Sequence, residues 1–302
     1  MNDTTHNPFQ FDPHLVQAIA ADAAEILDSF REVEEIVGDV HQTYYEPAYE
    51  IPRIEKIARD GGSLIDLFRA ELLRFHLLQG RRIAEHLADF VCEFNRRRLL
   101  ACTLALRAVL EVSAALGYYV AKFEAMLPDG EWSDEVCDEF VKLLDKAVRG
   151  SRFDWGRWAS DGSDRQNLRD AYDAWRQIKD GKKKREAEPT PELTQVNVQT
   201  MVEHLANEMG SHPRCGKGYV ETTYCLLSDM CHPSVGATLV ALLNEPADDH
   251  DIIGPGVSDS LMAWYWVEVV SPLVKPITAF AQERLDKIIE IGGKFSVSPD
   301  EQ

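Results

Sequence analysis

Hydrophobic residues recur every three or four positions along most of this chain, the spacing at which side chains share one face of a helix. Runs of alternating Val, Ile and Thr, which are typical of strands, are nearly absent, and no Asn-Gly hairpin signal occurs. The pattern predicts an all-α protein, a multi-helix bundle with long central helices and a smaller helical insertion.

The ends of the expected helices carry boundary signals. Asp12 and Ser63 are suited to cap helix N-termini, and Ser133 is suited to open a further helix. Gly38 is suited to end the first helix, and Pro272 and Pro276 are suited to kink the last one. The expected helices cover residues 13–37, 63–98, 99–127, 133–148, 163–179, 191–210, 219–231, 233–244 and 257–291.

The domain organisation is predicted from one linker. Residues 180–191 combine a glycine, a basic run and two prolines, a composition typical of a connecting segment. We expect residues 1–127 and 191–291 to form the helical bundle and residues 128–190 to form a helical insertion that includes the basic linker. Residues 292–302 are expected to be a disordered tail.

The overall charge is strongly acidic. The 302 residues carry a formal net charge of −19 at pH 7, so the surface as a whole does not attract nucleic acid or anionic lipid. Basic residues concentrate at Arg81-Arg82, Arg96–Arg98 and Lys182–Arg185. RNA contact is therefore expected only at these local basic patches, although such runs are more often solvated helix faces or linkers.

The cysteines and the N-terminus predict a cytoplasmic protein. No apolar leader precedes the first expected helix, and the six scattered cysteines are typical of reduced thiols. The stretch that comes nearest to a membrane span is Leu261–Ala281, but Glu268, Lys275 and two prolines interrupt it. We interpret it as a core helix and expect no membrane contact.

One expected helix is apolar nearly all round and is therefore predicted to be central. Between Leu99 and Tyr119 its only charges are Arg107 and Glu111, which share one face with Tyr118. A charge inside an apolar core is costly unless it is paired, and an Arg and a Glu four residues apart on a helix can pair directly.

A second polar stripe lies in the expected helix at residues 219–231. Tyr224, Ser228 and His232 follow one another at intervals of four residues, among apolar neighbours. Because His232 precedes Pro233, it is expected where the helix ends, facing inward. The candidate catalytic residues are Arg107, Glu111, Tyr224, Ser228 and His232.

These stripes admit a structural and a functional interpretation. An internal Arg–Glu pair, with a Ser and a His at a helix end, can simply fix the register of a bundle. Polar groups gathered in a cleft with perturbed pKa values instead mark functional sites. A buried group that draws on both stripes would favour function, and the sequence leaves open whether the stripes meet.

The segments LALRAVLEVSAALGYY and YCLLSDMCHPS resemble bacterial helical proteins of the HEPN-like type, which carry an Arg…Glu helix and a late Tyr-x-x-Leu-Ser…His-Pro segment. The resemblance covers residues 96–126 and 195–245. It implies an all-α bundle, often dimeric, with a role in bacterial stress or defence. We expect a protein that acts by binding or oligomerisation, with a homodimer or another protein as its partner.

The alternative is a metal-independent RNA endonuclease of the HEPN type, as some members of that group are ribonuclease toxins. His232 would act as the acid or base, and Arg107 would stabilise charge on the phosphate. Glu111, Tyr224 and Ser228 would orient these two groups.

Catalytic HEPN proteins carry an Arg followed, after four to six residues, by a His. This chain has Arg69…His76 and Arg81…His86, but both pairs lie outside the segments that carry the resemblance. A pattern this short arises by chance, so we interpret both histidines as ordinary helix residues. Enzyme activity therefore stays open.

Metal and cofactor motifs are weak or missing. His212, Cys215, Cys231 and His232 offer zinc ligands, but adjacent Cys-His ligands are unusual and a helix separates the two pairs. Core thiols are the favoured interpretation. No phosphate-binding glycine loop occurs, and we expect neither a metal nor a cofactor.

A loop expected at residues 150–162 combines arginines with tryptophans. This composition suits stacking on nucleic-acid bases or a protein-binding hot spot, and it equally suits a loop held on the bundle by its indole rings. The candidate binding residues are Arg152, Trp155, Arg157 and Trp158.

Overall fold

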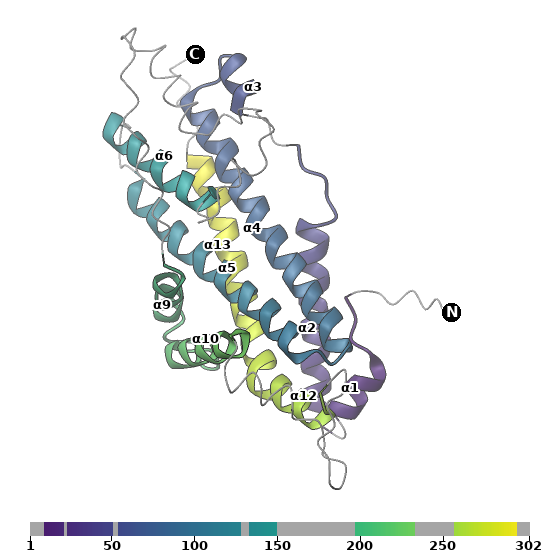
Figure 1. Cartoon of the computed structure of the whole chain (residues 1–302). Coiled ribbons are helices and arrows are strands. Elements are labelled where there is room, and N and C mark those ends of the chain that lie inside the picture. The colour runs from purple at the N-terminus through teal and green to yellow at the C-terminus, as the bar shows by residue number, and fades with distance from the viewer. Residues whose placement is uncertain are drawn as a thin grey trace. The chain divides into compact units, whose positions relative to one another are not determined.

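The structure, a computed structural model of the whole chain, describes residues 9–20, 23–50, 54–127, 133–149, 197–232 and 257–294. Every regular element in these ranges is helical, and none of these residues forms a strand (Figure 1). The predicted all-α class is therefore confirmed, and the finer arrangement of the bundle stays a prediction.

The chain divides into two compact units, each assembled from segments far apart in sequence. Unit 1 comprises residues 1–48, 79–115 and 198–283, and unit 2 comprises residues 49–78, 116–197 and 284–302. Three of the boundaries between the units fall within long helices, namely α4 (Leu64–Asn95), α5 (Leu99–Met126) and α13 (Ser271–Lys294).

The described part of unit 1 has an aromatic core. Besides its parts of the long helices, it contains α1 (Pro13–Ala20), α2 (Ala24–Tyr44), α9 (Val198–Glu208), α10 (Lys217–Cys231), α12 (Asp259–Tyr265) and the π-helical turn η1 (Trp266–Val270). The buried indole of Trp266 stacks on Phe30 at 3.5 Å between ring centroids and meets Phe11 and Phe94 edge-on. Its N–H donates to the hydroxyl of Ser29 at 2.7 Å, so the one polar atom of the ring is satisfied.

The first predicted helix is in fact two helices. Its N-cap is confirmed, because the carboxylate of Asp12 accepts the backbone N–H of His14 at 2.8 Å. The helix then stops at Ala20, and α2 starts after Ala23, whose backbone is extended. The prediction of one helix over residues 13–37 is therefore wrong.

Gly38 does not end α2, which continues to Tyr44. The ring of Tyr44 is buried and packs on Gly80 of α4, where a Cβ atom would overlap it. A glycine inside a helix costs only about 1 kcal/mol relative to alanine, less than the burial of a tyrosine ring contributes. A tertiary contact thus outweighs the local signal, and it also explains the glycine within α4.

The predicted helix at residues 257–291 is continuous but changes its winding just before Pro272. Ser271 donates its N–H to the carbonyl of Trp266, five residues earlier, as in a π-helix. Pro272 has no N–H to offer the carbonyl of Glu268, and the hydroxyl of Tyr219 on α10 donates to that carbonyl at 2.9 Å. We therefore attribute the π-helical turn to Pro272, and the hydroxyl of Tyr219 replaces the hydrogen bond that this proline cannot make.

The two helices from residue 191 to residue 231 differ in how well their starts were predicted. Asn197 is not helical, so α9 begins at Val198, later than the predicted start at Pro191. Helix α10 begins at Lys217 and ends at Cys231, close to prediction.

The described part of unit 2 contains α3 (Ile54–Arg59), α6 (Asp134–Arg149) and parts of the three long helices. Its core includes the rings of Phe68, Phe75, Phe123 and Phe140. The predicted caps are confirmed: Ser63 accepts the N–H of Asp66 at 3.2 Å, and Ser133 accepts that of Val136 at 3.3 Å.

The predicted domain boundaries are only partly covered by the described residues. Of the expected insertion at residues 128–190, the structure describes 133–149, which form α6. Helix α13 continues to Lys294, so the expected tail at 292–302 cannot begin at residue 292.

Among the described helices, α5 alone has the length and hydropathy needed to cross a membrane, so the prediction that Leu261–Ala281 comes nearest to a span is wrong. Of its most apolar stretch, 61% is buried inside the structure, and a buried core helix passes the same test.

Candidate functional site

The charged pair of the first predicted stripe forms as its spacing indicates. The Nε–H of Arg107 donates to Glu111 Oε1 at 2.8 Å on α5, within unit 1. The two side chains are 23% and 29% exposed, so the pair is neither sealed in the core nor fully solvated. Tyr118 belongs to unit 2, where the ammonium of Lys122 lies 5.8 Å from its ring centroid.

The two predicted stripes meet at Tyr224 of α10. Its hydroxyl donates to Glu111 Oε1 at 3.5 Å, and the guanidinium carbon of Arg107 lies 5.7 Å from its ring centroid, a cation–π contact. Burial and the nearby carboxylate raise the pKa of the Tyr224 hydroxyl, which stays protonated. Arg107, Glu111 and Tyr224 therefore form one connected group between α5 and α10.

Arg107 is held as a permanent cation. Burial lowers its pKa, but hydrogen bonds to Glu111 and to the thiol of Cys231 outweigh that effect and the net shift is upward. The guanidinium thus joins two points of α10, Tyr224 and Cys231, to α5.

The structure does not bring the last two candidate catalytic residues into this group. Ser228 is half-buried, and no hydrogen bond or ion pair of its side chain to Arg107 or Glu111 occurs in the described part of the chain. His232 lies where α10 ends, as predicted, and its backbone N–H donates to Asp229 at 3.2 Å. Its side chain is exposed, so the expectation that it faces inward is wrong: beyond the helix end, the extended backbone turns it to solvent.

A different histidine is close enough to the charged pair for the carboxylate of Glu111 to act on it. His86 on α4 is half-buried, and burial and the guanidinium of Arg82 lower its pKa, against the opposing charges of Asp89, Glu85 and Glu111. Its ring is therefore mostly neutral near pH 7. We name the group Arg82, Glu85, His86, Asp89, Arg107 and Glu111 the His86 cluster.

The sequence analysis missed His86 as a neighbour of Glu111. Arg82 and His86 are four residues apart on one face of α4, which was the available signal, but nothing in the sequence shows that this face meets α5. Arg81, the residue of the short Arg…His pattern, instead donates to the carbonyl of Tyr45 at 3.4 Å and lies over the tyrosine ring.

The solvent side of α5 in unit 1 is largely apolar. Leu100 and Leu104 are 37% and 55% exposed. At about 100° per residue, these two side chains, Arg107 and Glu111 lie within about 60° of one another around the helix. We name these four residues the α5 stripe. The prediction that α5 is central on all sides is therefore wrong here, because one side faces solvent.

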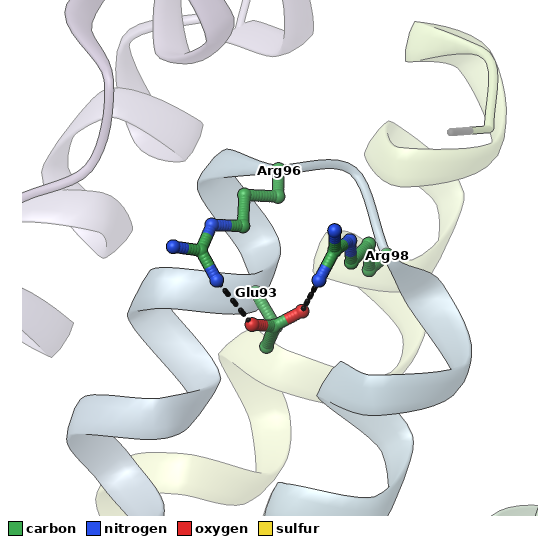
Figure 2. Close-up of polar contacts among 3 residues, drawn as sticks. All are labelled: Glu93, Arg96 and Arg98. Atoms are coloured by element: carbon green, nitrogen blue, oxygen red, sulfur yellow. Dashed lines mark hydrogen bonds and ion pairs between the residues drawn. The ribbon is translucent and has the colours of Figure 1, made fainter. Parts of the chain in front are cut away.

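The α5 stripe begins beside an arginine-rich corner between α4 and α5. Figure 2 shows the carboxylate of Glu93 between two guanidinium groups, 2.8 Å from Arg96 and 3.4 Å from Arg98. Arg97, in the left-handed region with φ 58°, pairs instead with Asp259 at 2.7 Å. We name Glu93, Arg96 and Arg98 the Arg corner; with two cations and one anion it carries an excess positive charge.

The residues considered for zinc have other contacts. His212 Nδ1 accepts the backbone N–H groups of Arg214 at 3.3 Å and Cys215 at 3.0 Å, which stabilises the loop before α10. Burial raises the pKa of the Cys215 thiol to about 12, so it stays protonated. No group of three or more metal-ligating side chains occurs in the described ranges.

Several predicted features lie outside the described residues. They are the expected helices at residues 163–179 and 233–244, the candidate binding residues Arg152, Trp155, Arg157 and Trp158, and the basic run Lys182–Arg185.

Comparison with family models, curated proteins and solved structures finds no match for this chain. The resemblance to HEPN-like proteins therefore stays a prediction from the two segments that carry it.

Proposed function

We propose that this protein acts by binding a protein partner, and that the α5 stripe of unit 1 is its contact surface. The observation that carries the proposal is the exposure of Leu100 and Leu104, one turn apart on a helix whose other sides are buried. Single exposed leucines are ordinary, but an adjacent pair framed by charged groups has the composition of an interface with an apolar centre and a polar rim.

In this function the polar group acts as a support. The guanidinium of Arg107, which is paired with Glu111 on the same helix, bonds to Cys231 of α10, and the hydroxyl of Tyr224 on α10 donates to Glu111, so the group holds α10 against α5. These contacts hold α5 in place, and so they fix the position of the surface that carries Leu104. A cytoplasmic location and a stress or defence role follow from the sequence resemblance alone and belong to the same proposal.

The test uses one exposed leucine on the stripe and one away from it. Leu104→Glu places a charge in the proposed contact, and Leu78→Glu, a leucine of α4 in unit 2 that is 45% exposed, is the matched control. Both positions are exposed, so each variant should keep its stability within about 0.5 kcal/mol. Tagged wild type, Leu104→Glu and Leu78→Glu are expressed in the native cells, and captured proteins, including untagged copies of the chain, are quantified.

We expect wild type and Leu78→Glu to capture a partner that Leu104→Glu does not capture. We also expect the purified partner to bind the purified wild-type protein. Equal capture by all three proteins rejects the proposal.

A second candidate function is metal-independent RNA cleavage, favoured by the position of His86. The neutral imidazole of His86, on which the carboxylate of Glu111 acts, would supply a proton acceptor, and the fixed guanidinium of Arg107, which is paired with Glu111, would stabilise charge on a phosphate. The exposed His232 follows Cys231, which contacts Arg107, and would supply the acid.

This candidate is tested by RNA cleavage in the presence of EDTA. His86→Ala and Arg107→Ala should each lower the rate by about 100-fold or more, while His14→Ala, a change at an exposed histidine of α1, should leave it unchanged. An intact fold without cleavage by wild type, or with equal rates in all variants, excludes it.

A further inference from the structure

We propose that unit 1 contains a binding site for an extended peptide of another protein with a phenylalanine at its centre, and that residues 9–12 of this chain occupy the site from within the molecule. We name these four residues the N-terminal segment. The inference goes beyond the proposed function, because the site does not include the α5 stripe. The argument comes from the way in which the segment is held.

The ring of Phe11 fills a pocket made of four aromatic rings. It is 2% exposed, and it meets each of these rings edge-on, at 5.1–6.2 Å between ring centroids. Edge-on contacts are a favourable geometry for aromatic pairs and contribute beyond the area that they bury, so the site favours a phenyl ring over an aliphatic side chain. We name the four rings the aromatic pocket; they belong to Phe30 on α2, Phe90 and Phe94 on α4, and Trp266 in η1.

Two side chains bind the backbone on either side of this ring. Asn95, the last residue of α4, donates from Nδ2 to the carbonyl of Gln10 at 2.8 Å, and its Oδ1 accepts the N–H of Asp12 at 2.8 Å. The carboxylate of Glu34 on α2 accepts the N–H of Phe11 at 2.7 Å. A carbonyl and an N–H two residues apart are the pair that a neighbouring parallel strand would bond. The site therefore recognises an extended backbone without reading its side chains.

The site and its occupant are separable. Within the described residues, the side chains of Asn95 and Glu34 make no hydrogen bond or ion pair except those with the N-terminal segment. Gln10 and Phe11 form no backbone–backbone hydrogen bond with a described residue, and the helical bonds of α1 begin at the carbonyl of Asp12. The residues before Asp12 can therefore leave the site without breaking a hydrogen bond of any helix.

The N-terminal segment shows which ligand the site prefers. Its side chains alternate as in a strand, so that Phe11 enters the aromatic pocket while the ring of Phe9 lies 4.0 Å from that of His41 on α2, between centroids. The ligand class is thus an extended peptide with the pattern Phe-x-Phe, whose second phenylalanine enters the pocket.

The covalent tether decides the source of this peptide. In a second copy of this chain the same segment is already bound in its own site, at the high effective concentration that a short tether provides. A segment of another protein must instead displace the N-terminal segment, which acts as an internal inhibitor of the site.

The experiment measures peptide binding by the full chain. A fluorescent peptide with the sequence of residues 8–14, Pro-Phe-Gln-Phe-Asp-Pro-His, is titrated with protein, and its anisotropy is followed. The triple variant Phe9→Gly, Gln10→Gly, Phe11→Gly vacates the site and should bind the peptide about 100-fold or more tightly than wild type, since its own segment no longer competes. Phe11→Leu keeps an apolar side chain in the pocket, which preserves the fold, and should bind about 10-fold more tightly than wild type.

Two controls test the contacts themselves. A peptide with alanine in place of its second phenylalanine should bind about 10-fold or more weakly, because it leaves the aromatic pocket empty. Adding Asn95→Ala to the triple variant should weaken binding about 10-fold, because two hydrogen bonds to the peptide backbone are lost. Asn207→Ala, a change at an exposed asparagine of α9, is the matched control and should leave binding unchanged.

Failure of both the triple variant and Phe11→Leu to bind the peptide overturns the inference. So does equal affinity for the two peptides, or equal affinity of the Asn95→Ala and Asn207→Ala proteins. A complex between the triple variant and wild type in sedimentation equilibrium would show that a second copy supplies the segment, and would overturn the assignment to another protein. None of these outcomes involves Leu104, so the proposed function is tested separately.

Discussion

The hydroxyl of Tyr219 replaces a hydrogen bond that Pro272 cannot make, and its removal should have a measurable cost. The carbonyl of Glu268 has no donor four residues later in the helix, and Tyr219 donates to it at 2.9 Å, with the carbonyl of Val269 3.2 Å away. Burial raises the pKa of Tyr219 to about 12, so the hydroxyl keeps its proton wherever folding is normally measured. Tyr219→Phe removes this donor, together with the hydrogen bond between the hydroxyl and the side chain of Thr223.

The expected loss is about 1 kcal/mol of unfolding free energy. A hydrogen bond of this kind contributes about 0.5–1.5 kcal/mol net, and a fully buried orphan carbonyl costs up to about 3 kcal/mol. The lower range applies because Glu268 lies at the surface, where water can partly replace the lost donor.

A double-mutant cycle with Pro272→Ala shows whether the hydroxyl acts through the proline. Alanine supplies the missing N–H to the carbonyl of Glu268, so in that background Tyr219→Phe should cost less than about 0.5 kcal/mol. Unfolding is followed in urea by the fluorescence of the tryptophans, which include the buried Trp266. An equal cost of Tyr219→Phe in both backgrounds would refute the reasoning.

Three further predictions use the same urea-unfolding assay. Gly80→Ala should lower the free energy of unfolding by about 1–3 kcal/mol, because its Cβ overlaps the ring of Tyr44. Gly38→Ala has open space around the new methyl group and should raise the free energy of unfolding by about 0.5–1 kcal/mol. A change of the same sign in both variants would contradict this reasoning. Arg107→Ala should cost no more than about 1 kcal/mol, since the ion pair that it breaks is partly exposed, and a loss of about 3 kcal/mol would show that the pair behaves as buried. Burial lowers the pKa of His76, so its contribution to stability is complete above pH 6.5 and is lost as the pH falls through the folded-state value. His76→Gln should therefore flatten the decline of stability below pH 6.5, and an unchanged slope would exclude the histidine as its source.

Local chemistry was sufficient for several features of the fold. The serine caps at Ser63 and Ser133 were predicted correctly because a cap bonds to a backbone N–H only three residues away. The Arg107–Glu111 pair followed from spacing alone, because both side chains stand on the same helix face.

Reasoning from local sequence patterns predicted only part of the candidate site. Tyr224 was singled out correctly as a polar group within an apolar helix, but its contact with Glu111 joins residues more than a hundred positions apart. His86 was set aside because its sequence pattern is common, and only the packing of α4 on α5 gives it Glu111 as a neighbour. His232 was placed at the correct helix end but with the wrong orientation.

The sequence by itself determined that this protein is helical and where most of its helices lie, because periodicity and capping act over a few residues. Only the tertiary structure decided that α2 continues past Gly38, that the chain forms a π-turn before Pro272, and that one side of α5 stays exposed. Each of these outcomes depends on whether a distant part of the chain packs at that point. The ring of Tyr44 packs on Gly80, the hydroxyl of Tyr219 bonds to the π-turn, and no described helix covers Leu104. Packing energies of this kind exceed local preferences of about 1 kcal/mol, and for that reason they override them.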